Sequence, residues 1–115
     1  MQSEALQKFC LSLPAVTEDI KWGNDLCFSV GGKMFCVTSL EPPLRYSFKV
    51  RDDEFDELSN RDGFMPAPYM ARAKWVTVIK TSVLSKKEQE KFIRQSYELV
   101  KAKLTKKSRM ELGIE

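Results

Sequence analysis

The sequence contains no histidine, only three cysteines and no long apolar run. Without an imidazole, the chain lacks the commonest general base, the commonest metal ligand and every histidine-based triad. No apolar stretch approaches the roughly 18 residues of a membrane span. Residues 1–10 also lack the basic and apolar regions of a signal peptide. We therefore expect a cytoplasmic protein without a membrane segment.

The cysteines, Cys10, Cys27 and Cys36, are odd in number and include no C-x-x-C pair. This pattern indicates neither a disulfide framework nor a zinc site. We expect three reduced, mostly buried thiols, since a reactive thiol would need an activating neighbour. Neither a cofactor nor a bound metal is expected.

The chain is short, at 115 residues, with 43% hydrophobic and 30% charged residues. This is the size and composition of one soluble globular domain. The sequence shows no repeat, linker or composition boundary, and a single domain over residues 1–108 is expected. Residues 109–115 are expected to form a short tail, and the basic stretch from Lys106 onward is expected to fray.

The net charge of +3 is unevenly distributed along the chain. Seven basic and eleven acidic side chains give residues 1–70 a net charge of −4, and twelve basic and three acidic ones give residues 71–109 a net charge of +9. The last six residues contribute −2. A basic segment of this kind attracts phosphate backbones and acidic partners, but it is equally typical of a solvated, lysine-rich helix face.

The first half of the chain predicts one helix followed by antiparallel strands. Leu6, Cys10 and Leu13 share one helical face over residues 3–13, and Pro14 ends that helix. Gly31-Gly32 between two alternating runs indicates a hairpin. Tyr46, Phe48 and Val50 alternate with polar residues, which is typical of a strand with one buried face. The expected strands cover residues 17–22, 26–30, 34–40 and 44–50.

The second half predicts a short helix over residues 52–60 with Asp52 as N-cap, a loop over 61–74 and a strand over 75–80. A long helix begins after Ser85, because Ser85 and Glu88 have the spacing of a capping box. The fold class is therefore α+β: a single antiparallel sheet with the N- and C-terminal helices packed on one face.

Several short motifs in their order resemble the MmcQ/YjbR family over roughly residues 5–107. They are Leu13-Pro14, Trp22-Gly23-Asn24-Asp25, residues 30–35, Pro66 with Trp75, residues 96–100 and residues 102–104. The resemblance implies a CyaY-like fold and DNA binding, because the family fold is similar to a double-wing DNA-binding domain. It implies no catalytic residues. Members of the family often carry Asn-Lys-x-His-Trp where this chain has Ala71-Arg72-Ala73-Lys74-Trp75, so the cation and the tryptophan are kept while the amide and the imidazole are absent.

We interpret the sheet face away from the helices as the candidate nucleic-acid surface, with DNA or another polyanion as partner. Cations hold phosphates, and an exposed aromatic ring can stack on a base. Trp75 could instead face the core, and the two apolar faces of residues 75–79 leave both orientations open. The candidate residues are Arg45, Lys49, Arg72, Lys74, Trp75 and Lys80.

The alternative is a protein-interaction or small-ligand module that uses a pocket around Trp75 and Tyr69, or a two-fold interface over the sheet. The protein is accordingly expected to be a monomer or a weak homodimer.

Frataxin-type proteins of similar fold bind iron through acidic residues, but residues 52–57 span under two helical turns and point several ways. No iron site is expected.

Five residues could each act as an acid or base: Asp19, Asp25, Lys33, Tyr69 and Lys74. No spacing pairs them, and we expect no enzyme.

Overall fold

The computed structural model describes residues 3–21, 23–41, 43–68 and 70–114. One antiparallel sheet of six strands has the order β1-β2-β3-β4-β6-β5. The strands are β1 (Val16–Lys21), β2 (Asp25–Val30), β3 (Lys33–Ser39), β4 (Tyr46–Lys49), β5 (Phe64–Pro66) and β6 (Trp75–Val78). The helices are α1 (Ser3–Ser12), α2 (Phe55–Ser59), α3 (Lys86–Lys101) and α4 (Lys106–Leu112), with 3-10 turns η1 (Ala71–Ala73) and η2 (Thr81–Val83).

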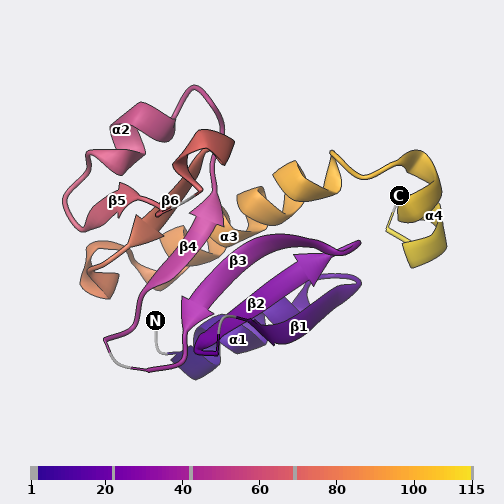
Figure 1. Cartoon of the computed structure of the whole chain (residues 1–115), viewed down its shortest axis with the longest axis horizontal. Coiled ribbons are helices and arrows are strands. Elements are labelled where there is room, and N and C mark those ends of the chain that lie inside the picture. The colour runs from indigo at the N-terminus through magenta and orange to yellow at the C-terminus, as the bar shows by residue number, and fades with distance from the viewer. Residues whose placement is uncertain (1–2, 22, 42, 69, 115) are drawn as a thin grey trace.

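Helices α1 and α3 lie behind the sheet in Figure 1 and cover one of its faces, called here the helix face. Phe48 of β4 stacks on Phe92 of α3 with ring centroids 5.6 Å apart, and Phe35 meets Tyr97 edge to face at 5.4 Å. Arg94 of α3 lies over the ring of Phe9 of α1. These contacts join the two helices and the sheet in one apolar core and confirm the predicted α+β architecture.

The predicted local signals act as expected at two places. Gly31 and Gly32 join β2 to β3 with φ values of +59° and +80°, which a two-residue hairpin turn of this hand requires. The Ser85 hydroxyl accepts the Glu88 backbone N–H, and the Glu88 carboxylate accepts the Ser85 N–H. This capping box begins α3, whose buried positions include Ile93, Tyr97 and Val100.

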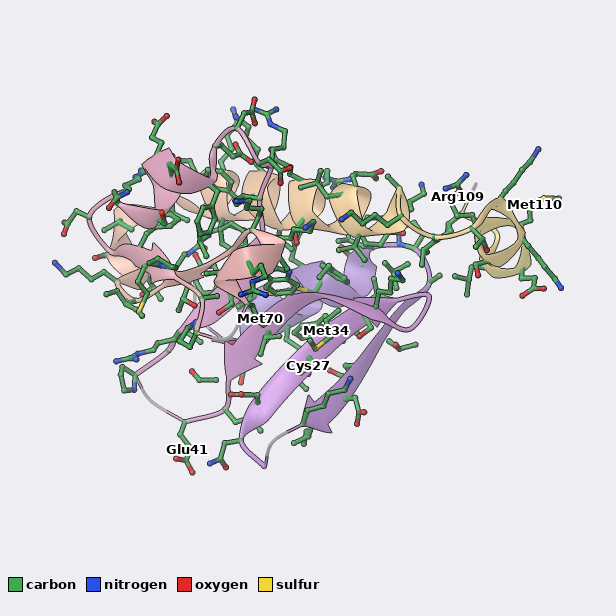
Figure 2. All side chains as sticks on the ribbon, turned by 45° about the horizontal axis from the view of Figure 1, so that its top comes forward. Cys27, Met34, Glu41, Met70, Arg109 and Met110 are labelled. Carbon is green, nitrogen blue, oxygen red and sulfur yellow. The ribbon has the colours of Figure 1, made fainter. Side chains whose placement is uncertain are left out.

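Three predictions about elements are wrong. Helix α2 begins at Phe55 rather than near Asp52, and its N-cap position is Glu54. The expected loop over residues 61–74 contains strand β5, which pairs with β6 at the edge of the sheet. The stretch from Lys106, expected to fray, forms α4 instead: the Thr105 hydroxyl accepts the Ser108 N–H, and Ile114 is buried. Figure 2 shows Met110 on α4 and Arg109 beside the segment that joins it to α3.

All three cysteines are free and fully buried, as the sequence predicts. A hydrogen bond with Cys10 and then burial raise the pKa of the Cys36 thiol well above its ordinary value. Burial also raises the pKa of Cys27, and the nearby Lys21 opposes this effect. Because the thiolate is the nucleophile, the raised pKa values of Cys27 and Cys36 favour their unreactive thiol form.

We expect Ellman's reagent to detect no fast-reacting thiol in the folded protein and three after denaturation. The physical reason is that reaction needs access to the sulfur, and all three thiols are buried; for Cys27 and Cys36 the raised pKa also disfavours the thiolate. A Ser12→Cys variant is a matched control, because Ser12 is exposed on α1 and its thiol should react at once. Rapid reaction of the unmodified folded protein would contradict the burial of these thiols.

No helix in the described part of the chain combines the length and apolar character that a membrane crossing requires. Within residues 3–21, 23–41, 43–68 and 70–114, no three carboxylates or thiols converge as ligands for a metal ion.

Candidate anion site at the end of β4

The register between β4 and β6 shows on which face of the sheet each side chain lies. Phe48 pairs with Val76 and Tyr46 with Val78, all buried on the helix face. Lys49 pairs with Trp75, and Ser47 with Thr77, on the opposite face. The Ser47 and Thr77 hydroxyls are 2.7 Å apart, which shows that their side chains point the same way.

Trp75 therefore faces away from the helices, yet the residue is only 4% exposed. The preceding segment folds back on it: the Ala67 N–H donates to the Trp75 carbonyl at 3.0 Å, and the Trp75 N–H donates to the Met70 carbonyl at 3.3 Å. The sequence analysis left open an exposed Trp75 or a Trp75 that faces the core, and the structure shows neither. The ring lies outside the core between the sheet and the helices, but it is still buried. It presents no open face on which a base could stack.

The predicted cations divide between the two ends of the β4–β6 pair. Arg45 precedes β4 and lies about 13 Å along the strands from Lys49, and Lys80 follows β6 and lies about 16 Å from Lys49. Arg45 is exposed, and Lys80 forms an exposed ion pair with Asp62 at 3.4 Å. An ion pair of this type contributes little to stability. Lys49, Arg72 and Lys74 are at the other end.

Lys74 ends η1 in the left-handed region, at φ 65° and ψ 48°, which is strained for a residue with a side chain. Its N–H donates to the Ala71 carbonyl at 2.9 Å, and its carbonyl accepts the Val50 N–H at 2.8 Å. Its ammonium lies 5.1 Å from the centroid of the Phe55 ring of α2. These contacts fix the position of a half-buried cation beside the end of β4. Arg72 is exposed in η1.

Hydrogen bonds fix both the side chain and the backbone of Lys49. Its ammonium donates to the Ala73 carbonyl at 2.6 Å, and its backbone N–H donates to the Ser96 hydroxyl of α3 at 2.9 Å. The Ser96 hydroxyl in turn donates to the Phe35 carbonyl at 2.6 Å. Ser96 therefore bridges β3 and β4 just beyond their last paired residues, Cys36 and Phe48, and attaches α3 to the sheet there.

A third lysine, Lys103, lies just beyond the C-terminal end of α3 and approaches Lys49. Burial first, and then the ammonium of Lys103, lowers the pKa of Lys49 below its ordinary value of 10.5; Lys74 lowers it further, whereas Asp52 opposes the shift. We call Lys49, Lys74 and Lys103 the lysine cluster. Like charges raise the energy of one another, and a bound anion would relieve that repulsion.

Lys49 and Lys103 also line one hollow of about 380 Å³. Its remaining lining residues are Val50, Arg51, Asp52, Asp53 and Leu99. The turn that forms one wall is rigid: the Arg51 N–H donates to Glu54 Oε1 at 2.9 Å, the Arg51 guanidinium pairs with Asp53 at 3.1 Å, and the Gln95 amide of α3 donates to Glu54.

The sequence analysis placed Lys49, Arg72 and Lys74 in one candidate surface together with Arg45, Trp75 and Lys80, and it included Lys103 only in the basic segment of residues 71–109. No local signal connects residues 49 and 103, and α3 brings them together by crossing behind β3 and β4 (Figure 1). The other residues named as potential acids or bases are dispersed: Asp19 is in β1, Asp25 in β2, and Lys33 at the start of β3. Tyr69, the remaining one, lies outside the described residues, as does Trp22 of the motif series.

The fold and site define a small α+β domain with helices on one face of an open sheet and a basic hollow at the end of its fourth strand. The sequence profile of the YjbR family matches residues 11–99, and the chain belongs to this family. No curated protein matches the chain.

The solved structures to which this chain is similar include the following two. The protein DR2400 of Deinococcus radiodurans, which contains the family domain DUF419, is 30% identical, with a TM-score of 0.87 over 97% of this chain and 88% of that one. A structural-genomics target from Pseudomonas syringae is 18% identical, with a TM-score of 0.73 over 87% of this chain and 99% of that one. The second likeness supports the fold alone.

Proposed function

We propose that this protein binds nucleic acid weakly and without strong sequence preference, through phosphate contacts at the lysine cluster. Two observations carry the proposal: Lys49 and Lys103 line one hollow at the end of β4, and the charge of nearby Lys74 helps to lower the pKa of Lys49. Phosphate contacts of this kind bring affinity without sequence information. No enzymatic activity is part of the proposal.

The mode of contact differs from the one that the sequence suggested. Because Trp75 is buried, stacking on its ring is omitted, and contact depends on charge alone. Arg72 lies beside the cluster and is retained as a contact, whereas Arg45 and Lys80 are at the far end of the strands. The alternative of a two-fold interface is not needed to bury Trp75, because this residue is already buried within the single chain.

Fluorescence anisotropy with a labelled single-stranded DNA should show binding at 50 mM salt and about tenfold weaker binding at 200 mM, as expected for two or three phosphate contacts. Lys103→Glu should weaken binding at low salt at least tenfold, because it replaces a cation of the cluster by an anion. It should leave the melting temperature unchanged or higher, since it also relieves the repulsion on Lys49.

Lys8→Glu is the matched control, because it makes the same charge change at an exposed position of α1. Its affinity should stay within a factor of about two to three of the unmodified protein, as for a surface charge outside the contact. Absence of binding at low salt, or an equal loss for both variants, would refute the proposal.

A further inference from the structure

The hollow at the end of β4 contains charges of both signs, and their arrangement limits which phosphate can occupy it. Lys49 and Lys103 line it together, and Lys74 is close enough to Lys49 to lower its pKa. Two of the three cations of the lysine cluster thus share one hollow rather than following a track along the surface. Such a group neutralises a single compact anion better than a row of separated ones.

Two carboxylates line the same hollow as these lysines. Asp52 and Asp53 line the hollow and are exposed; Asp53 pairs with Arg51 at 3.1 Å, and Asp52 is near Lys49. A continuous strand that crossed the hollow would bring its neighbouring phosphates near these carboxylates, and the like charges would repel. A strand that ends in the hollow places one phosphate between the lysines and keeps the others outside.

The charge and size of the hollow agree with an end group. A terminal phosphate monoester carries nearly two negative charges at pH 7, since its second pKa is about 6, whereas an internal phosphodiester carries one. The volume of about 380 Å³ is in the range of a small-ligand pocket. Val50 and Leu99 add an apolar part to the lining.

We infer that the hollow of Lys49, Lys103 and the 50–53 turn binds the terminal phosphate monoester of a nucleic-acid strand, with Lys74 beside it. This inference rests on the proposed function and adds the group that the site recognises. The ligand is a strand end, and an internal stretch of the same strand should bind more weakly.

The experiment compares internally labelled single-stranded oligonucleotides of one sequence that carry a 5′-phosphate, a 3′-phosphate or hydroxyls at both ends. At 50 mM salt, one phosphorylated form should bind at least tenfold more tightly than the unphosphorylated form. This difference should disappear in Lys103→Gln and in Lys49→Met, because each removes one cation of the hollow. It should persist in Lys8→Gln, the control on α1.

A competition arm identifies the group that is recognised. Adenosine monophosphate should displace the phosphorylated oligonucleotide, whereas adenosine should not. Circular dichroism of each variant confirms folding, and Lys103→Gln alone suffices for the test because Lys103 is exposed.

Equal affinity for phosphorylated and unphosphorylated strands, or equal displacement by adenosine, overturns this inference and leaves the proposed function in place. Absence of binding by every oligonucleotide overturns the proposed function, and this inference with it. A preference that Lys103→Gln leaves intact shows that the end group binds elsewhere and also overturns the inference.

Discussion

Ser96→Ala is expected to lower the free energy of unfolding by about 3 kcal/mol, although it removes only one oxygen atom. The Ser96 hydroxyl is fully buried, accepts the Lys49 N–H and donates to the Phe35 carbonyl. Alanine leaves both backbone groups without that partner, and a buried unsatisfied group costs about 1–3 kcal/mol. Thermal unfolding should show a melting temperature lower by roughly 10–20 °C.

The same substitution should also weaken oligonucleotide binding, because Ser96 fixes the backbone of Lys49. Ser12→Ala is the control, since Ser12 is exposed near the end of α1 and bonds only the Phe9 carbonyl within its own helix. We expect it to change stability by less than about 0.5 kcal/mol. If Ser96→Ala were as stable as Ser12→Ala, the bridge between β3 and β4 would not contribute as described.

Phe48→Ala is expected to cost about 4 kcal/mol, the usual range for a large aromatic side chain removed from a core. Phe48 is fully buried in the centre of the sheet, with Phe92 of α3 at 5.6 Å and Tyr46 at 6.0 Å between ring centroids. The shortened side chain leaves a cavity between the sheet and α3 where both helical and strand contacts are lost. Chemical denaturation followed by circular dichroism measures the loss.

Because Phe48→Ala could leave too little stability for a folded state, Phe48→Leu provides a milder second variant, with an expected cost of less than about 2 kcal/mol. Leu11→Ala is the surface control, because Leu11 is 42% exposed on α1. It should change the free energy of unfolding by less than about 0.5 kcal/mol. Similar costs for Phe48→Ala and Leu11→Ala would contradict the assignment of Phe48 to the core.

The elements that the sequence predicted well are those specified by neighbouring residues. Ser85 and Glu88 form a capping box from side chains three residues apart. Gly31 and Gly32 adopt the two positive φ values of a hairpin turn, which few other residues tolerate. The alternation of Tyr46 and Phe48 with polar residues placed the buried face of β4 correctly.

The elements that were missed depend on distant partners. Strand β5 has three residues and includes Pro66, so it carries almost no strand signal and forms because β6 offers it an edge. Helix α2 begins later than the acidic residues suggest, because Glu54 bonds the Arg51 N–H and the Gln95 amide of α3 instead of extending the helix toward Asp52.

The candidate site likewise contains residues that the sequence identified and one that it could not connect to them. The sequence identified Lys49 and Lys74 because both belong to a strand or flank one, and the pairing of Lys49 with Trp75 places them together. It could not assign a role to Trp75, because residues 75–78 are buried on both faces. It also could not connect Lys103 to Lys49, since residues 54 positions apart share no local pattern.

The sequence by itself determined the α+β class, the hairpin, the start of α3, the excess of cations in the last third and the absence of any imidazole chemistry. These properties follow from composition and from contacts within a few residues, where periodicity and capping act. Only the tertiary structure decided that Trp75 is buried outside the helical core and that Lys103 meets Lys49 beside Asp52 and Asp53. The physical reason is that packing α3 against the sheet, through Phe92, Ser96 and Tyr97, determines which distant charges become neighbours.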